Sequence, residues 1–236
     1  MPEVLAAVEA GQDSLVTSVA ELVSGILQAG TRRLDVPDGL SQERVAALVL
    51  RALAEPSAVL AVLAAHPSLR AACWRVVQRA RKPVVLAPPG AKVRRPAISR
   101  VLLPLDGTPE SAVAVADTMG LLARVGVDLV VLHVFDAATV PRFWDQAAHA
   151  HQAWTEEFLA RNAATVGARL ELRSGSPGEH VVDVAGAEQA DLIALGWSQH
   201  LDAGRSRTVR RSVLHAGAPV LLLPIGGGEG TFVHQE

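Results

Sequence analysis

The second half of the chain alternates short apolar runs with helical segments, and this alternation restricts the possible folds more than any other feature. Apolar runs of this length are typical of buried strands, and a helix between successive strands lets the strands run parallel. The sequence therefore predicts an α/β fold with a five-stranded, parallel, doubly wound sheet. The expected strands are residues 99–105, 128–136, 168–175, 191–197 and 218–226, and the expected helices are residues 111–125, 141–166, 176–190 and 208–217.

The composition agrees with such a fold. Half of the residues are hydrophobic but only 3% are aromatic, so alanine, valine and leucine must fill the core. The net charge of −2 provides no strong field for nucleic acid or a membrane surface. Cys73 is the only cysteine, which excludes an intrachain disulfide and fits a reducing compartment. Because neither a signal peptide nor an apolar run long enough to span a membrane is present, we expect a cytoplasmic protein without nucleic-acid or membrane partners.

The first half contains a partial echo of the second. With Glu43 aligned to Glu179, residues 33–90 and 168–226 share the order helix, strand, loop, helix, Pro-Val strand. Similar composition of two Ala- and Val-rich stretches is the alternative explanation. Before Arg33 only residues 16–30 have helical spacing, so this copy is expected to lack its opening strand, helix and second strand. The expected organisation is a truncated, degenerate repeat (1–90), a linker (91–98), a complete domain (99–226) and a flexible tail (227–236).

The stretch from Asp191 to Pro224 has the outline of a phosphate site. An apolar strand ends on Gly196, an arginine-rich polar loop follows, and a helix then leads into the last strand. Glycine lets backbone N–H groups approach phosphate oxygens, and the N-terminus of the next helix offers free N–H groups and a positive dipole end. Ligands of doubly wound sheets bind beyond the carboxyl ends of the strands, where Asp106, residues 134–136 and residues 196–199 are expected.

Several pieces of the second half, from Arg100 to Ile225, resemble the universal stress protein family. They are RVLLPLDGTPES, VLHVFD, SGSPGEHVVDVAGAEQADLIALG and the closing Ala-Pro-Val-Leu strand, in that order. The resemblance implies a universal-stress-protein-like, adenine nucleotide alpha hydrolase-like domain. It also implies dimerisation through the last strand and, as in many members, an adenine-nucleotide site. The first half then resembles a truncated tandem copy.

In family members that bind ATP, the loop after the fourth strand reads G-x2-G-x9-G-[S/T]. Gly196 matches the first glycine, Gln199 stands at the second, and the loop is about three residues shorter. Ser206, Arg207 and Thr208 replace the final Gly-Ser pair. The resemblance thus implies an altered nucleotide or anion site. Its members are Asp106, Gly107, Val134, Gly196, Gln199, Ser206, Arg207 and Thr208.

Alternatives exist for several of these residues. Asp106 could cap a helix through the amides of Gly107 and Thr108, and Val134 could belong to the core. Arg205, Arg207, Arg210 and Arg211 could bind phosphate, fill the space of the ligand, or form ion pairs with Asp202 or Glu188. In the first half Leu63 or Ala64 aligns with Gly196 and no glycine-rich loop follows, so a nucleotide site is not expected there.

These features predict a non-catalytic, stress-response binding protein whose pocket takes ATP, another adenine nucleotide or a different anion, with Mg²⁺ entering only with a nucleotide. An interaction or dimerisation module that has lost nucleotide binding is the alternative, and slow ATP hydrolysis is a third hypothesis. The strands PVVLAP and PVLLLP could pair within the chain as an internal pseudo-dimer, or the last strand could mediate self-association.

Other side chains are expected to be structural. His149 and His151 point to different sides of a helix and cannot share a metal ion, and no zinc signature is present. His133 lies inside a strand, where a hydrogen-bonded core histidine is expected. Trp144, Trp154 and Trp197 are expected to anchor the core or an interface rather than to stack on a base. For Cys73 we expect buried packing.

Overall fold

The computed structural model describes residues 1–9, 11, 13–135, 148–163, 167–201 and 205–225. The strands are β1 (Glu3–Val8), β2 (Gly30–Asp35), β3 (Ala58–Ala64), β4 (Val84–Ala87), β5 (Arg100–Pro104), β6 (Asp128–Phe135), β7 (Arg169–Ser174), β8 (Leu192–Trp197) and β9 (Val220–Pro224). The helices are α1 (Asp13–Leu27), α2 (Gln42–Leu53), α3 (Ala72–Arg79), α4 (Pro109–Arg124), α5 (Ala148–Asn162), α6 (Pro177–Ala187) and α7 (Arg205–His215).

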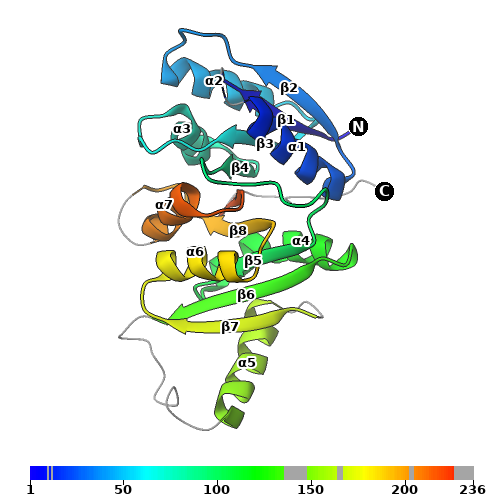
Figure 1. Cartoon of the computed structure of the whole chain (residues 1–236), viewed down its shortest axis with the longest axis vertical. Helices are drawn as coiled ribbons and strands as arrows, with labels where there is room; N and C mark the ends of the chain where they lie inside the picture. The colour runs from blue at the N-terminus through cyan, green and yellow to red at the C-terminus, as the bar shows by residue number, and fades with distance from the viewer. Residues whose placement is uncertain (10, 12, 136–147, 164–166, 202–204, 226–236) are drawn as a thin grey trace.

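All of these strands belong to one sheet with the order β2-β1-β3-β4-β9-β8-β5-β6-β7 (Figure 1). Neighbouring strands are parallel except β4 and β9, which pair antiparallel where the two halves of the chain meet. The second half contributes β7-β6-β5-β8-β9, so the prediction of a five-stranded parallel sheet is confirmed.

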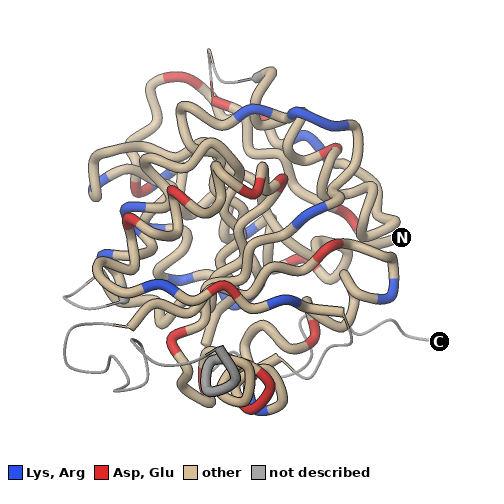
Figure 2. Tube along the Cα trace, turned by 60° about the horizontal axis from the view of Figure 1, so that its bottom comes forward, with Lys and Arg blue, Asp and Glu red and all other residues tan. Residues whose placement is uncertain are grey.

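Helices cover both faces of the sheet, as a doubly wound fold requires. One core lies under α2, α3, α6 and α7 and contains, for example, Val49, Val76 and Val213. The other lies under α1, α4 and α5 and contains Val19 and Val115. Residues of one strand alternate between the two cores because successive side chains of a strand point to opposite faces. Along the trace, basic and acidic residues are interspersed (Figure 2). The central strands β3, β4, β8 and β9 contain neither.

The expectation that the first half lacks its front was wrong. Residues 3–8 form β1, which is almost fully buried, and α1 packs on it. The strand expected near Arg33 is β2, and it finds its partner in β1 along its whole length. The first half is therefore shortened in another way, because it has four strands where the second half has five. Strand β2 lies beside β1 as β6 lies beside β5, and among the described residues no counterpart of β7 follows it.

The echo between the halves is present in the structure. The order α2-β3-α3-β4 matches α6-β8-α7-β9, and the two Pro-Val strands pair with each other. Ala64 pairs with Ala87 as Gly196 pairs with Leu223, so Ala64 is the counterpart of Gly196. Counting along β1 and β5 from their pairs with β3 and β8 makes Glu9 the counterpart of Asp106.

The boundaries of the predicted helices are close to the observed ones. Helix α4 begins two residues earlier than expected and α7 three residues earlier. The expected helix over 141–166 contains α5. Residues 141–147, which include Trp144, and residues 164–166 lie outside the described residues, as do Asp136 and the tail from residue 226. Within the described ranges, none of the helices combines the length and apolar character needed to cross a bilayer.

Candidate functional site

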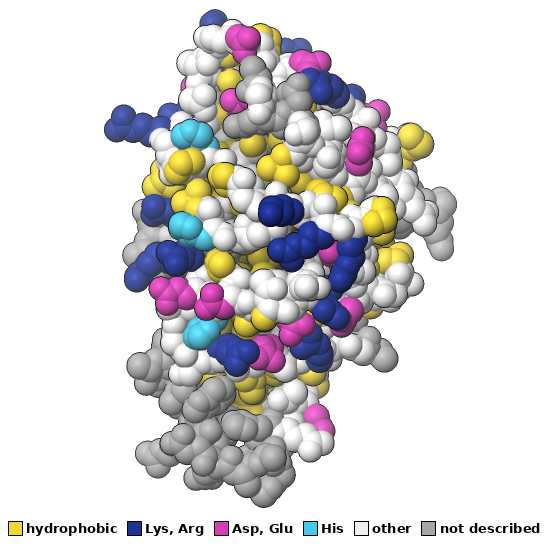
Figure 3. Space-filling model, in the orientation of Figure 1, with side chains coloured by type: hydrophobic (Ala, Val, Ile, Leu, Met, Phe, Trp, Pro, Cys, Tyr) yellow, Lys and Arg dark blue, Asp and Glu magenta, His cyan; other side chains and the backbone are white. Residues whose placement is uncertain are grey.

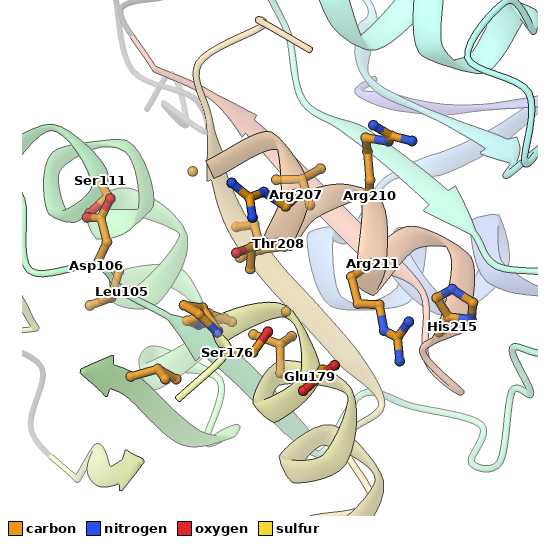
Figure 4. Close-up of a pocket in the computed structure, with 18 of the residues that line it drawn as sticks. Leu105, Asp106, Ser111, Ser176, Glu179, Arg207, Thr208, Arg210, Arg211 and His215 are labelled. Carbon is orange, nitrogen blue, oxygen red and sulfur yellow. The ribbon is translucent and has the colours of Figure 1, made fainter. Parts of the chain in front are cut away.

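A cleft of about 800 Å³ opens at the carboxyl ends of β5, β6 and β8 (Figure 4). Strands β5 and β8 are neighbours in the sheet although β6 and β7 lie between them in the sequence. The chain leads from β5 to β6 on one side of this pair and from β8 to β9 on the other, so the two connections leave in opposite directions. Such a switch point is where doubly wound folds bind ligands. The lining comprises Pro104, Leu105, Asp106, Ser111, Val134, Ser176, Pro177, Gly178, Glu179, Val181, Leu195, Gly196, Arg207, Thr208, Val209, Arg210, Arg211, Leu214 and His215.

Five of the eight predicted site residues line this cleft. They are Asp106, Val134, Gly196, Arg207 and Thr208. Gly107, Gln199 and Ser206 are not among the lining residues. The structure thus brings the carboxyl end of β5, Gly196 near the end of β8 and the start of α7 to one place. Whether these residues bind a ligand stays a prediction.

Asp106 directly follows the strand region of β5 and organises the start of α4. Its Oδ1 accepts hydrogen bonds from the Thr108 N–H at 3.0 Å, the Thr108 hydroxyl at 2.7 Å and the Ser111 hydroxyl at 2.5 Å. Thr108 is the N-cap of α4 and accepts a bond from the Ser111 N–H at 3.4 Å. The prediction that Asp106 stabilises the start of the helix is confirmed for its hydrogen bond with the Thr108 amide. The hydrogen bonds hold the Asp106 carboxylate, and with it a negative charge, at the rim of the cleft.

Gly196 allows two elements to meet at the floor of the cleft. A Cβ at this position would lie 3.3 Å from Cδ1 of Ile225 and 3.5 Å from Cα of Ser111. An alanine would need a small shift of the Ile225 side chain, and a larger side chain would enter the cleft between β8 and α4. The first glycine of the family pattern thus suits the close approach of these elements.

Helix α7 supplies the positive charge of the site. Figure 4 shows the Arg207 guanidinium pointing across the cleft toward the side of Asp106, while Arg210 points away and Arg211 lies along α6. Among the described residues, none of the three forms an ion pair with a carboxylate. None of these three pairs with Glu188, which instead pairs with Arg169 and Arg100. The side chain of Arg205 and the whole of Asp202 lie outside the described residues.

The start of α6 forms a wall of the cleft that the sequence analysis missed. A Cβ on Gly178 would lie 3.0 Å from Cβ of Arg211 and 3.4 Å from Cα of Thr208, so this glycine lets α6 pack tightly against α7. Glu179 adds a second carboxylate to the lining. The sequence does contain a signal for this wall, the helix start SPGEH directly after a strand. It was missed because the carboxyl end of β7 was not counted among the strand ends that face a ligand.

Gly107 and His133 belong to an aromatic cluster beside the Asp106 end of the cleft. Gly107 has φ of +80°, and a Cβ there would lie 3.4 Å from His133 and 3.5 Å from Phe158. His133 is 9% exposed, packs between Phe135 and Phe158, and its Nδ1 donates to the Leu105 carbonyl at 2.8 Å. Burial lowers its pKa, against the opposing effects of that hydrogen bond and of Asp106. The core role predicted for His133 is confirmed.

The other residues expected to be structural also lie in the core, as far as they are described. Trp197 is 1% exposed, and Trp154 stacks on Phe158 with ring centres 4.9 Å apart. Cys73 is buried, and burial raises the pKa of its thiol to about 11. The side chains of His149 and His151 are outside the description. Among the described residues, no group of three or more His, Cys, Asp or Glu side chains could hold a metal ion.

The first half has a smaller cleft at the equivalent place, of about 430 Å³. It is lined by Glu9 and Ala64, the counterparts of Asp106 and Gly196. Here Oε1 of Gln42 accepts a hydrogen bond from the N–H of Ala72 at 2.7 Å, in the first turn of α3. Gln42 aligns with Gly178. The Gln42 side chain therefore caps the start of α3 in the first half, whereas Gly178 has no side chain that could cap the start of α7 in the second half.

The fold and the place of the cleft define the class of this protein: a doubly wound α/β protein made of two unequal, fused repeats. The model of the universal stress protein family matches residues 97–224, more than half of the chain, and the chain belongs to this family. No curated protein sequence shows a significant match.

Solved structures resemble the whole chain. A universal stress protein from Archaeoglobus fulgidus DSM 4304 has a TM-score of 0.63 at 15% identity, covering 95% of this chain and 96% of that chain. A functionally unknown protein from Pseudomonas aeruginosa PAO1 has a TM-score of 0.66 at 14% identity, with 95% and 93% covered. A universal stress protein in complex with cAMP is 20% identical, with a TM-score of 0.42 and 55% and 98% covered. The full-length matches show that the fold is a tandem one.

Proposed function

We propose that the second half is a non-catalytic binding domain for an adenine nucleotide or a related phosphate-bearing ligand. The observation that carries this proposal is the arginine side of the cleft, where Arg207 points across the cleft and, like Arg211, has no carboxylate partner among the described residues. Guanidinium groups bind phosphate through paired hydrogen bonds and can replace the backbone contacts of the missing glycines. The opposite side offers an apolar surface of Leu105 and Val134, which suits a base.

The two clefts differ in a way that supports one ligand per chain. In the first half Gln42 caps α3, and the Glu9 carboxylate stands without a comparable set of arginines. In the second half the residue at the same position is Gly178, which packs closely beside Thr208 and has no side chain that could cap the start of α7. We therefore propose that the first half does not bind a nucleotide and that Mg²⁺ enters the second half only with the ligand's phosphates.

Thermal unfolding with Mg·ATP, AMP, cAMP and inorganic phosphate tests the proposal. A ligand present at 100 times its Kd stabilises the folded protein by roughly 2.7 kcal/mol. We expect stabilisation by at least one nucleotide, one bound molecule per chain, and no release of phosphate from ATP. If none of the four ligands shifts the transition, the binding proposal is wrong and the interaction module remains.

We further propose that the seam between β4 and β9 serves as an internal pseudo-dimer contact. This pairing covers an apolar strand edge that would otherwise be open. The outer strands β2 and β7 expose charged residues such as Arg33 and Arg173, which disfavour edge pairing with another chain. Sedimentation at micromolar concentration should therefore show a monomer, and a stable dimer would contradict the proposal.

A further inference from the structure

The loop that follows β8 is attached to the first half by two side chains. Nε1 of Trp197 donates to the Val77 carbonyl at 2.9 Å, and Nε2 of Gln199 donates to the Ala80 carbonyl at 2.5 Å. Both acceptors belong to the C-terminal end of α3, where Ala80 is the C-cap. The last carbonyls of a helix lack partners within the helix, so donors from the second half complete the end of a helix of the first.

The backbone of Gln199 gives a second, independent reason to regard this contact as specific. Its φ is +65°, in the left-handed region that L residues rarely adopt. Glycine, which stands here in the family pattern, would adopt this conformation without strain. At position 199 the glutamine side chain makes a contact that glycine cannot make, the hydrogen bond to the Ala80 carbonyl.

Residues on both sides of Gln199 extend this attachment. Trp197 is 1% exposed, and Leu201 packs against the core cluster that contains residues of both halves. Gly196, directly before Trp197, lines the cleft together with Arg207 and Thr208 of α7. On the face of the molecule seen in Figure 3, basic, acidic and apolar side chains are mixed near α6 and α7.

We infer that Gln199 is a positioning residue: it clamps the loop after β8 to α3, and the first half thereby holds the start of α7 in place beside the cleft. Gln199 acts without touching the ligand, since it does not line the cleft. The inference deepens the proposed function and rests on it for the effect on binding, whereas the clamp itself can be tested without any ligand.

Hydrogen–deuterium exchange on the full chain tests the clamp. Gln199→Ala removes the hydrogen bond, and Gln199→Gly removes it while relieving the backbone strain. We expect the amides of residues 77–80 at the end of α3 and 209–212 of α7, which donate hydrogen bonds within their helices, to exchange about tenfold faster in both variants, because a lost hydrogen bond of about 1.4 kcal/mol corresponds to a factor of ten. Gln189→Gly is the matched control: Gln189 is exposed, also has positive φ (+51°), and ends α6 without contacting the first half, so exchange in both segments should stay unchanged.

Each result decides the inference. Unchanged exchange of residues 77–80 in both Gln199 variants would refute the clamp, and faster exchange there with unchanged residues 209–212 would refute the positioning of α7. If the wild type binds ATP, both variants should bind it several-fold more weakly, and equal affinity would also overturn the inference. If the wild type binds none of the tested ligands, the proposed function fails while the exchange data still decide on the clamp.

Discussion

The hydroxyl of Ser111 lies 2.5 Å from Oδ1 of Asp106 and joins the first turn of α4 to the carboxyl end of β5. The same hydroxyl lies within 3.0 Å of the Thr108 carbonyl, and Cα of Ser111 faces Gly196. This one serine therefore ties together three of the elements that form the cleft. A small residue with a hydroxyl group suits this position because the position is buried and close to Gly196 of β8.

We expect Ser111→Ala to lower the free energy of unfolding by about 1–3 kcal/mol, because a buried hydrogen bond to a charged acceptor is lost. Urea unfolding at neutral pH measures the change. Ser57→Ala is the control, since the Ser57 hydroxyl also donates to a carboxylate, Glu3, but at 3.2 Å and in a less buried place. Equal losses in the two variants would contradict a special role for the bond between Ser111 and Asp106.

Gly178→Ala should destabilise the protein by about 1–3 kcal/mol, as overpacking usually does. The new methyl group would lie 3.0 Å from Cβ of Arg211, so α6 and α7 must separate. Gly186→Ala in the same helix has open space around the new Cβ and should instead stabilise by up to about 1 kcal/mol through helix propensity. Thermal unfolding of both variants gives the comparison, and a neutral Gly178→Ala would show that the helices can adjust.

Asp191 is expected to stabilise the fold at neutral pH. Burial by itself would raise its pKa, but hydrogen bonds from the Ser99 N–H, the Ser99 hydroxyl and the Arg100 N–H, together with the charge of Arg95, lower it. A carboxylate whose pKa is lower in the folded state stabilises that state above the unfolded pKa of about 3.9. This stability is lost as the pH falls through the folded pKa.

The corresponding test is Asp191→Asn, which keeps the shape and removes the charge. At pH 7 the variant should unfold about 2 kcal/mol more easily, in the range for hydrogen bonds to charged groups. Below the unfolded pKa of about 3.9 the difference should shrink progressively, because the wild-type carboxyl then becomes protonated as well. Urea unfolding over this pH range provides the measurement, and a difference that is independent of pH would show that the charge is unimportant.

His133 predicts a second pH effect with a different window. Burial lowers its pKa below the unfolded value of about 6.5, so near that pH the unfolded chain takes up a proton that the folded chain does not. Stability therefore falls as the pH drops through about 6.5 and stops falling once the folded histidine is protonated.

His133→Asn tests this effect, because asparagine retains an N–H donor for the Leu105 carbonyl but does not titrate. The variant should be less stable overall, since it loses the ring contacts with Phe135 and Phe158. Its deficit relative to the wild type should be smaller at pH 5.5 than at pH 7.5. His200→Asn makes the same substitution at an exposed position and serves as control for the effect of replacing a histidine in general. A constant deficit for His133→Asn would refute the assignment.

Much of the fold could be predicted because its strands are nearly continuous apolar runs. Strand β8 reads LIALGW and β9 reads VLLLP, and parallel strands buried on both faces have this character. Strand β1 was missed because EVLAAV is short, rich in alanine and stands alone before a helix. Without β1, strand β2 had no partner, and a strand with alternating exposure such as β2 is specified mainly by its neighbour.

The site could be predicted where it follows from topology alone. Asp106 follows β5 and Gly196 lies near the end of β8, two parallel strands that end at the same edge of the sheet, and their meeting there is a consequence of parallel pairing. The wall formed by Gly178 and Glu179 depends on how closely α6 packs on α7, which a single sequence does not state. The direction of the Gln199 side chain was equally hidden, because it depends on a contact with the other half of the chain.

The arginines of α7 give the sharpest test of the binding site. Arg207→Ala should weaken binding of ATP, or of whichever nucleotide stabilises the wild type, by roughly tenfold to a hundredfold, the range for a charge-assisted hydrogen bond of 1.5–3 kcal/mol. Arg210→Ala removes the same charge from the same helix, but that guanidinium points away from the cleft and the affinity should change only slightly (Figure 4). Calorimetric titration at low and high salt should also show that Arg207→Ala makes binding less sensitive to salt, since a screened attraction has been removed. Equal effects of the two substitutions would mean that helix charge in general, and not a contact from Arg207, attracts the ligand.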